Sequence, residues 1–189
     1  KMAQEKRKKK FFDVEIPLIG KQTQMQAYEL SELNGRFLKY DLTRILRGKS
    51  VMLTLRVKVE KDEALTIPKK LEVLPYFIRR MVRKGTNYIE DSFPAECEDA
   101  NLRIKPLLVT RRKVSRAIRK ELRNKAREEM IEYVKKKTSE QLFDDVLKNQ
   151  MQKVLSLKLK KIYPLALCEI RVLEAKEKWA KDKREQSEL

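Results

Sequence analysis

A stretch of basic side chains between Arg111 and Lys137 is the part of this sequence that most clearly predicts chemistry. It contains 12 Lys or Arg residues against 4 Glu residues, in a chain whose formal net charge is +18. Arg116, Arg119 and Arg123 recur at spacings of three and four residues, which places them on one face of a helix. Like charges at these spacings repel one another, and a bound polyanion relieves that repulsion. The pattern therefore favours contact with nucleic-acid phosphates over a merely solvated helix face.

Other basic clusters extend this prediction to an N-terminal arm, a second short helix and the end of the last helix. The residues expected to bind RNA are Lys6, Arg7, Lys8, Lys9, Lys10, Arg79, Arg80, Arg83, Lys84, Arg111, Arg112, Lys113, Arg116, Arg119, Lys120, Arg123, Arg127, Lys158, Lys160 and Lys161. On charge alone, RNA, DNA and anionic membranes all qualify as partners. Only Tyr76 and Tyr133 lie near the basic faces, so base stacking on single strands is weakly indicated. Backbone recognition of folded RNA fits better.

Several kinds of catalysis are excluded by composition. The chain has no histidine, which removes Ser-His, Cys-His and His-metal chemistry within the chain. Cys97 and Cys168 are isolated in sequence and are expected to be reduced core thiols. The four glycines form no phosphate-binding loop motif. We therefore expect no enzymatic activity, no cofactor, no metal and no small-molecule substrate.

An acidic cluster leaves one enzymatic alternative open. It consists of Glu90, Asp91, Glu96, Glu98 and Asp99. A metal-dependent nuclease needs such carboxylates to converge on a metal ion. No paired-metal motif is visible, and a polar hairpin turn explains the cluster more simply.

The elements that must position these residues can be read from hydrophobic periodicity. Strict alternation predicts a strand over 51–60, with further strands over 11–16, 65–73 and 102–109. Periods near 3.6 residues predict helices over 75–84, 114–137 and 139–157. The expected fold is an α+β domain, with a curved, mostly antiparallel sheet, a barrel-like form as one option, three packed helices and basic tails.

The apolar side of the long helix is predicted from four residues at a spacing of four, with Ala117 beside them. These residues are Val114, Ile118, Leu122 and Ala126. We expect this row to face the core and the arginines to face away from it.

The expected organisation is a basic arm over 1–10, a single RNA-binding domain over 11–175 and a charged tail over 176–189. No apolar run reaches the length of a membrane span, and no secretory signal is visible, so a membrane partner is not expected. A protein-interaction adaptor remains an alternative, binding through the helix Leu142–Leu155 or through Trp179.

An ordered series of short motifs resembles a known family. The series is listed here in chain order: Phe11-Phe12-Asp13-Val14-Glu15-Ile16-Pro17, Ile19-Gly20-Lys21, Gly35-Arg36, Val82-Arg83-Lys84, Ile89-Glu90-Asp91, Leu102-Arg103-Ile104-Lys105-Pro106, Thr110-Arg111-Arg112, Ala117-Ile118-Arg119-Lys120 and Ile162-Tyr163-Pro164-Leu165. Over roughly residues 11 to 175 the chain resembles the small-subunit ribosomal protein family S-one-e, also called S-three-a-e, which archaea and eukaryotes share. The short tails are similar to those of archaeal members.

This resemblance implies a structural protein of the small ribosomal subunit, ribosome-bound in the cytoplasm and supporting translation. It implies a position on the platform near the messenger exit, with small-subunit ribosomal RNA and neighbouring ribosomal proteins as partners. The family usually has an Asp-Gly turn where this chain has Asp99-Ala100-Asn101, and Pro94 lies in the strand before it. We therefore expect the shape of that hairpin to differ from the family pattern.

Overall fold

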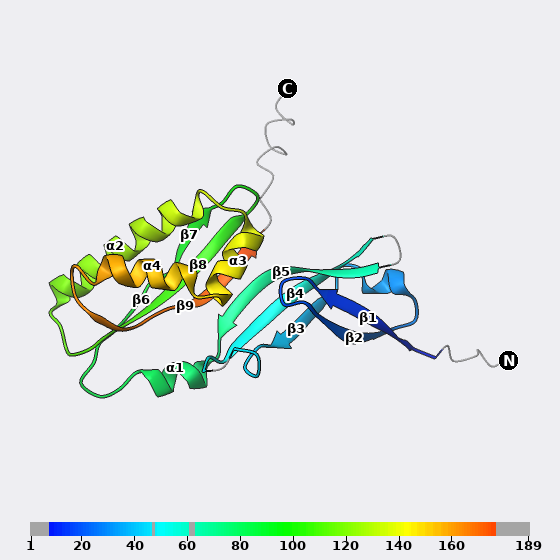
Figure 1. Cartoon of the computed structure of the whole chain (residues 1–189), viewed down its shortest axis with the longest axis horizontal. Coiled ribbons are helices and arrows are strands. Elements are labelled where there is room, and N and C mark those ends of the chain that lie inside the picture. Colours follow the sequence, from blue (N-terminus) through cyan, green and yellow to red (C-terminus); the bar gives the residue numbers. More distant parts are fainter. Residues whose placement is uncertain (1–7, 47, 61–62, 177–189) are drawn as a thin grey trace, which may run out of the picture.

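The computed structural model of this chain describes residues 8–46, 48–60 and 63–176. Its helices are α1 (Pro75–Met81), α2 (Arg116–Val134), α3 (Ser139–Leu147), α4 (Gln150–Leu159) and the short 3-10 helix η1 (Leu30–Leu33). Its strands are β1 (Lys10–Ile16), β2 (Lys21–Ala27), β3 (Phe37–Asp41), β4 (Val51–Glu60), β5 (Glu63–Val73), β6 (Tyr88–Glu90), β7 (Phe93–Glu96), β8 (Asn101–Thr110) and β9 (Leu165–Lys176). The molecule is elongated, with α2, α3 and α4 over β6–β9 at one end and β1–β5 with η1 at the other (Figure 1).

One branched sheet connects the two ends, and β5 is the strand they share. Near its start β5 pairs with β1 in parallel at Glu15 and Leu65, and near its end it pairs with β9 in antiparallel fashion. Its other edge pairs antiparallel with β4 along its whole length. The register shifts between Thr54 and Leu55, opposite Pro68, because proline cannot donate a ladder hydrogen bond.

Strand β8 organises the end that carries the helices. One edge pairs with β9 from Asn101 to Thr110, and the other edge pairs first with β7 and then with β6. Pro106 has no amide hydrogen to donate. It lies between the part of β8 that pairs with β7 and the part that pairs with β6, so no hydrogen bond to either of these strands is lost. The single β8 therefore aligns both short edge strands under the helices.

The main hydrophobic core runs through both ends of the molecule. Leu53 and Leu71 of the β4–β5 hairpin belong to the same buried cluster as Leu122 of α2 and Phe143 of α3. A smaller cluster around Val14 and Leu33 lies under β1, β2 and η1. Because the large cluster is continuous, α2 is positioned by the whole sheet and not only by its nearest strands.

The expected fold class is confirmed as α+β with a mostly antiparallel sheet, but two details were wrong. The sheet is not closed into a barrel, because β2, β3, β6 and β7 each pair with one neighbour only in the described chain. The described chain also has four α-helices where three were expected.

The extra helix arises because the predicted helix over 139–157 is broken into α3 and α4. Asn149 has a φ of +62° and lies in the left-handed region, which asparagine tolerates better than most residues. The Gln152 side-chain amide donates to the Val146 carbonyl at 2.9 Å and so satisfies one end of the break. A capping box formed by Thr138 and Gln141 is present at the start of α3.

Three helix and strand boundaries also differ from expectation. Helix α2 begins at Arg116, not Val114, and the predicted apolar neighbour Ala117 is exposed. Helix α1 ends at Met81, three residues earlier than expected. Strand β9 extends to Lys176, the last residue described at this end of the chain, so the predicted tail and Trp179 lie outside the described residues.

Candidate nucleic-acid interface

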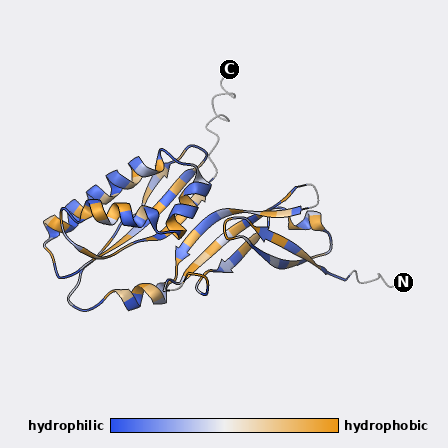
Figure 2. Ribbon diagram, in the orientation of Figure 1, coloured by the Kyte–Doolittle hydropathy of each residue, from blue (hydrophilic) through white to orange (hydrophobic). Residues whose placement is uncertain are grey.

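Helix α2 is held against the sheet by one row of apolar side chains. Four side chains spaced by four residues are buried: Leu122, Ala126, Met130 and Val134. Ser115 begins the helix, and its Oγ accepts a hydrogen bond of 3.4 Å from the Ile118 amide. Along the ribbon of α2, hydrophilic residues alternate with hydrophobic ones, as expected for an amphipathic helix (Figure 2). The packing therefore leaves the polar side of α2 facing solvent.

Four cations near the start of α2 form what we call the basic face: Arg116, Arg119, Lys120 and Arg123. Within the described ranges, none of these side chains has an ion-pair or hydrogen-bond partner. The first turn contains no acidic residue. Positive side chains at a helix N-terminus oppose the helix dipole, so this end of α2 carries two sources of positive potential and no internal anion to balance them. An external anion bound here relieves both.

Arg119 differs from the other members of the basic face. Its side chain is half-buried, whereas Arg116, Lys120 and Arg123 are exposed. Its Nε is shielded from solvent and has no hydrogen-bond partner within the described chain. A buried polar group without a partner is costly, so a bound phosphate that reaches this nitrogen stabilises the complex.

We define the basic turn as Arg111–Lys113. Asn87 makes hydrogen bonds to the residues on either side of it. The Asn87 Oδ1 accepts a hydrogen bond of 2.8 Å from the Val114 amide, and the Asn87 amide donates to Thr110 Oγ1 at 3.0 Å. The Thr110 hydroxyl also lies 2.7 Å from the Arg112 carbonyl oxygen. These contacts order the backbone of the turn while all three of its basic side chains remain exposed.

The second half of α2 has fewer cations and more carboxylates than the first half. Arg127 makes a bidentate contact with Asp91, with Nε–Oδ2 at 3.1 Å and Nη2–Oδ1 at 3.0 Å, and its guanidinium lies 5.4 Å from the Phe93 ring centre. Lys125 pairs with Glu128 at 3.5 Å and with Glu129 at 3.4 Å. Both cations of this half are therefore neutralised within the protein.

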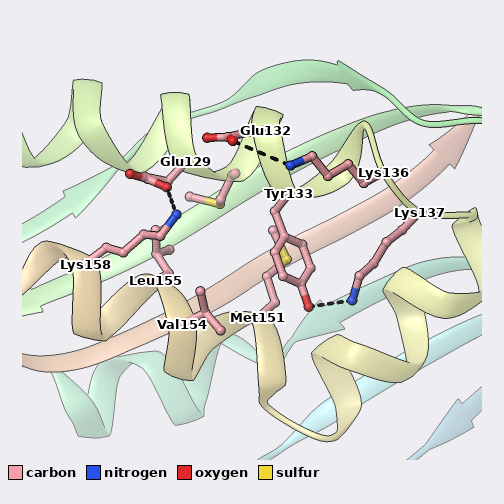
Figure 3. A pocket seen from close by; sticks show the side chains of 10 residues that line it. Glu129, Glu132, Tyr133, Lys136, Lys137, Met151, Val154, Leu155 and Lys158 are labelled. Carbon is pink, nitrogen blue, oxygen red and sulfur yellow. Dashed lines mark hydrogen bonds and ion pairs between the residues drawn. The ribbon is translucent and has the colours of Figure 1, made fainter.

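A groove of about 230 Å³ between α2 and α4 shows the same neutralisation (Figure 3). Met151, Val154 and Leu155 line it, and a Glu129–Lys158 ion pair spans the two helices. The hydrogen bond from Lys158 lowers the pKa of Glu129, and the hydrogen bond to Glu129 raises the pKa of Lys125. Both partners are thereby held in their charged forms.

Tyr133 lies at the other end of this groove, in a cluster with two charged groups. Its hydroxyl donates to Asp145 at 2.9 Å and accepts from Lys137 at 2.8 Å, while Lys137 also pairs directly with Asp145. Burial raises the pKa of Tyr133, and the hydrogen bond to Asp145 raises the pKa of Lys137. The cluster ties α2 to α3, and its tyrosine is not available as a base-stacking platform.

The remaining predicted RNA contacts are distributed over three places. Arg79, Arg83 and Lys84 are exposed on and just after α1, and Arg80 lies 5.5 Å from the Phe77 ring centre. Helix α4 runs antiparallel to α2 (Figure 1), and Lys158 near its end pairs with Glu129 in the second half of α2. The exposed Lys160 and Lys161, which follow Lys158, therefore lie toward the first half of α2.

The N-terminal arm is placed differently. Lys8, Lys9 and Lys10 are exposed at the opposite end of the molecule from the start of α2, and Lys9 lies 5.7 Å from the Tyr28 ring centre (Figure 1). Lys6 and Arg7 lie outside the described residues. The described residues Lys8, Lys9 and Lys10 do not form one continuous patch with the basic face.

The acidic cluster considered for a nuclease is used for internal contacts. Glu90 pairs with Arg171 at 2.8 Å, Asp91 pairs with Arg127, and Asp99 accepts hydrogen bonds from the Ser139 amide and hydroxyl. Over the described ranges, no group of three or more His, Cys, Asp or Glu side chains is arranged to hold a metal ion. Among the same residues, no helix is both long and apolar enough to span a bilayer.

Some structural features were not foreseen from sequence. The helix residues Leu142 and Leu155, considered for protein docking, are buried in the core. Tyr88, on an edge strand beside the basic turn, is instead 59% exposed. Its signal in the sequence was weak, because a single tyrosine after Asn87 has no periodicity that would distinguish an exposed side from a buried one.

The sequence of this chain is similar to those of known ribosomal proteins. A model described as the Ribosomal S3Ae family matches residues 1–178 of the chain. Small ribosomal subunit protein eS1 of Nanoarchaeum equitans is 28% identical over 182 residues, covering 91% of this chain and 92% of that protein. The eS1 protein of Haloarcula marismortui is 28% identical, covering 87% and 78%, and that of Methanothermobacter thermautotrophicus is 31% identical, covering 54% and 55%. The resemblance seen in the ordered motifs is confirmed, and this chain belongs to the Ribosomal S3Ae family.

Proposed function

We propose that this protein is a structural constituent of the small ribosomal subunit that binds ribosomal RNA through the basic face and the basic turn. Its family and its eS1 relatives support the ribosomal role. The observation that carries the RNA contact is the set of cations at the start of α2 without a partner in the described chain. Positive charge that the protein does not neutralise itself is what a phosphate backbone requires.

The chemistry of the basic face suits phosphates better than a protein partner. Three of its four members are arginines, whose planar guanidinium groups bind phosphate oxygens in pairs. Its first and last members, Arg116 and Arg123, lie about 10 Å apart along the helix axis at 1.5 Å per residue, so the face can follow a run of backbone phosphates. Lys160 and Lys161 lie toward the first half of α2 and add less directional attraction.

Cations that already have an ion-pair partner contribute less to RNA binding in this proposal. Arg127 is already bound to Asp91, and Lys158 is bound to Glu129. Contact of either with RNA must compete with an existing ion pair, so their net contribution to binding is smaller than that of an unpaired arginine. We assign Lys8, Lys9 and Lys10 a separate contact, because the start of β1 lies at the other end of the molecule (Figure 1).

The wider proposal follows the family. The protein acts as an RNA-binding domain over 11–175 with a structural rather than a catalytic role, bound to cytoplasmic ribosomes on the platform near the messenger exit. Neighbouring ribosomal proteins are its other partners. A cryo-electron microscopy reconstruction of subunits containing this chain tests the location directly.

The RNA contact is tested by assembly into subunits. A tagged chain carrying Arg116→Gln, Lys120→Gln and Arg123→Gln should be depleted from the small-subunit fraction of a sucrose gradient relative to wild type. Arg119 is left unchanged because its half-buried side chain has a structural environment. A control variant with Lys125→Gln, Lys135→Gln and Lys136→Gln loses the same charge from the second half of α2 and the two residues after it, and should still co-sediment.

Two outcomes contradict the proposal in different ways. Absence of wild-type protein from the small-subunit fraction removes the ribosomal role. Equal incorporation of wild type and both variants keeps that role but moves the RNA contact away from the basic face.

A further inference from the structure

A second cleft lies beside the basic turn, between α1 and the sheet. It has a volume of about 390 Å³, which is within the range of small-ligand pockets. Ile78 and Val82 form an apolar wall from α1 and the residue after it. Tyr88 and Glu90 line the cleft from β6, whereas Ile89 between them points to the opposite face of the sheet and is buried. The cleft is therefore an apolar slot with one aromatic side.

Tyr88 is unusual among the aromatic residues near the basic regions. It is 59% exposed and has no hydrogen-bond or ring partner within the described chain. Exposed tyrosine rings that border an apolar slot are typical of binding sites, because the ring supplies a large flat surface at a low entropic cost. The backbone at Tyr88 is held in place by its strand, since Tyr88 pairs with Val109 of β8.

The polar groups of the cleft can form hydrogen bonds with a ligand whose edge carries both donors and acceptors. Arg171 Nη1 donates to Glu90 Oε2 at 2.8 Å, and both side chains keep more than a third of their surface exposed. The carboxylate thus retains free acceptor positions and the guanidinium retains free donors. Arg79, at the rim, is exposed and unpaired with any described residue.

The backbone connects this cleft to the basic turn. Asn87, which binds the Val114 amide and fixes the basic turn, is the residue immediately before Tyr88. Phosphates held by Arg111 and Arg112 are therefore close in the fold to the strand that carries Tyr88. Arg79 adds positive charge on the α1 side of the cleft, and Arg83 and Lys84 follow α1 in the chain.

We propose that this cleft receives one unpaired RNA base, stacked on Tyr88, with its edge facing the Glu90–Arg171 pair and its flanking phosphates held by Arg79 and the basic turn. The inference rests on the proposed RNA-binding function and adds a base contact to it. The cationic rim favours a nucleotide over an apolar side chain of a protein. Unpaired bases stacked on aromatic side chains are the usual means by which proteins recognise folded RNA at bulges and loops.

The test compares two RNA hairpins that differ only in one bulged uridine. Full-length wild-type protein should bind the bulged hairpin more tightly than the fully paired one. Tyr88→Leu should reduce affinity for the bulged hairpin roughly tenfold, within the range expected for one stacked base, and leave the paired hairpin unchanged. Tyr76→Leu is the matched control, because Tyr76 is 55% exposed on α1 but does not line the cleft.

A second readout locates the base directly. With 5-iodouridine at the bulge, irradiation should cross-link the RNA to the peptide that contains Tyr88, and mass spectrometry should identify that residue. Cross-linking at Tyr76 or equal affinity of wild type for both hairpins overturns the inference. The inference is also overturned if a protein ligand binds in the cleft and RNA does not.

This experiment distinguishes a failure of the RNA-binding proposal from a failure of the base contact at Tyr88. The variant with Arg116→Gln, Lys120→Gln and Arg123→Gln should lose affinity for both hairpins, and its salt dependence should become shallower. Tyr88→Leu should alter only the bulged hairpin and leave the salt dependence as in wild type. If only the basic-face variant has an effect, the RNA-binding proposal stands and the base contact does not.

Discussion

The two halves of α2 present opposite electrostatic situations. In the first half, over 116–124, four cations stand against one glutamate, and the basic face has no partner in the described chain. In the second half, over 125–134, two cations stand against three glutamates, and Lys125 and Arg127 each lie within 4 Å of a carboxylate. Lys136, just after the helix, is paired in the same way. The halves therefore differ both in net charge and in whether the protein itself supplies the counter-charge.

A geometric cause underlies part of this difference. Buried positions spaced by four residues advance by about 40° per step around a helix of 3.6 residues per turn. Toward its end the apolar row of α2 therefore approaches the side that carries the cations. Arg127 consequently lies on Phe93 at the sheet edge, whereas Arg116 and Arg123 stay on the solvent side.

The largest expected effect comes from the apolar row that both halves share. Leu122→Ala removes a fully buried side chain from the main core and should lower the free energy of unfolding by about 3 kcal/mol. Leu157→Ala makes the same chemical change at a leucine that is 69% exposed on α4, and should cost less than about 0.5 kcal/mol. Urea unfolding followed by circular dichroism measures both. Equal losses would mean that α2 does not pack as described.

The difference between the halves should appear most clearly in salt dependence. Arg116→Gln, Lys120→Gln and Arg123→Gln together should flatten the slope of log affinity against log salt by about 0.7–0.9 per lost phosphate contact. Lys125→Gln, Lys135→Gln and Lys136→Gln remove equal charge from the second half of α2 and the two residues after it. They should flatten the slope much less, because Lys125 and Lys136 already pair with carboxylates. A salt titration on a small-subunit RNA fragment makes the comparison, and identical slopes for the two variants would erase the distinction between the halves.

A smaller effect, on stability alone, should follow from the Tyr133 cluster. Tyr133→Phe removes the hydroxyl that bonds Asp145 and Lys137, and should destabilise the fold by about 1 kcal/mol. Tyr163→Phe is the control, because that hydroxyl has no partner in the described chain. RNA affinity should be unaffected by either change. A loss of RNA binding in Tyr133→Phe would show that the second half also contacts RNA.

The smallest effect concerns acid sensitivity at the groove between α2 and α4. Because its pKa is lowered in the folded state, Glu129 contributes stability above the unfolded value of 4.5, and this contribution disappears as pH falls through the folded value. Glu129→Gln should therefore cost about 0.5 kcal/mol near pH 6 and progressively less below pH 4.5. Glu121→Gln, at an exposed site, is the control for unfolding midpoints measured across that range. A cost that does not change with pH would exclude the ion pair as its source.

Some elements were predictable from sequence because their determinants are local. The bounds of β4 agree with the alternation over 51–60, since a strand with one buried face must alternate. The amphipathic character of α2 was also correct, although its first residue was placed two positions early. That error arose because Asn87, far from Val114 in sequence, binds the Val114 amide and keeps it outside the helix.

The sequence by itself determined that α2 would have one apolar and one basic side, because helical periodicity depends only on neighbouring residues. The pairs of Lys125 with Glu128 and Glu129 also follow from that spacing, but only the tertiary structure decided the ion pairs that α2 makes with other elements. Arg127 meets Asp91 across 36 positions and Lys158 meets Glu129 across 29, and helical spacing cannot indicate such pairs. The break at Asn149 and the cleft beside Tyr88 likewise depend on how α1, α3 and α4 pack on the sheet. Contacts of a few ångströms are set by the fold as a whole, whereas periodicity is set residue by residue.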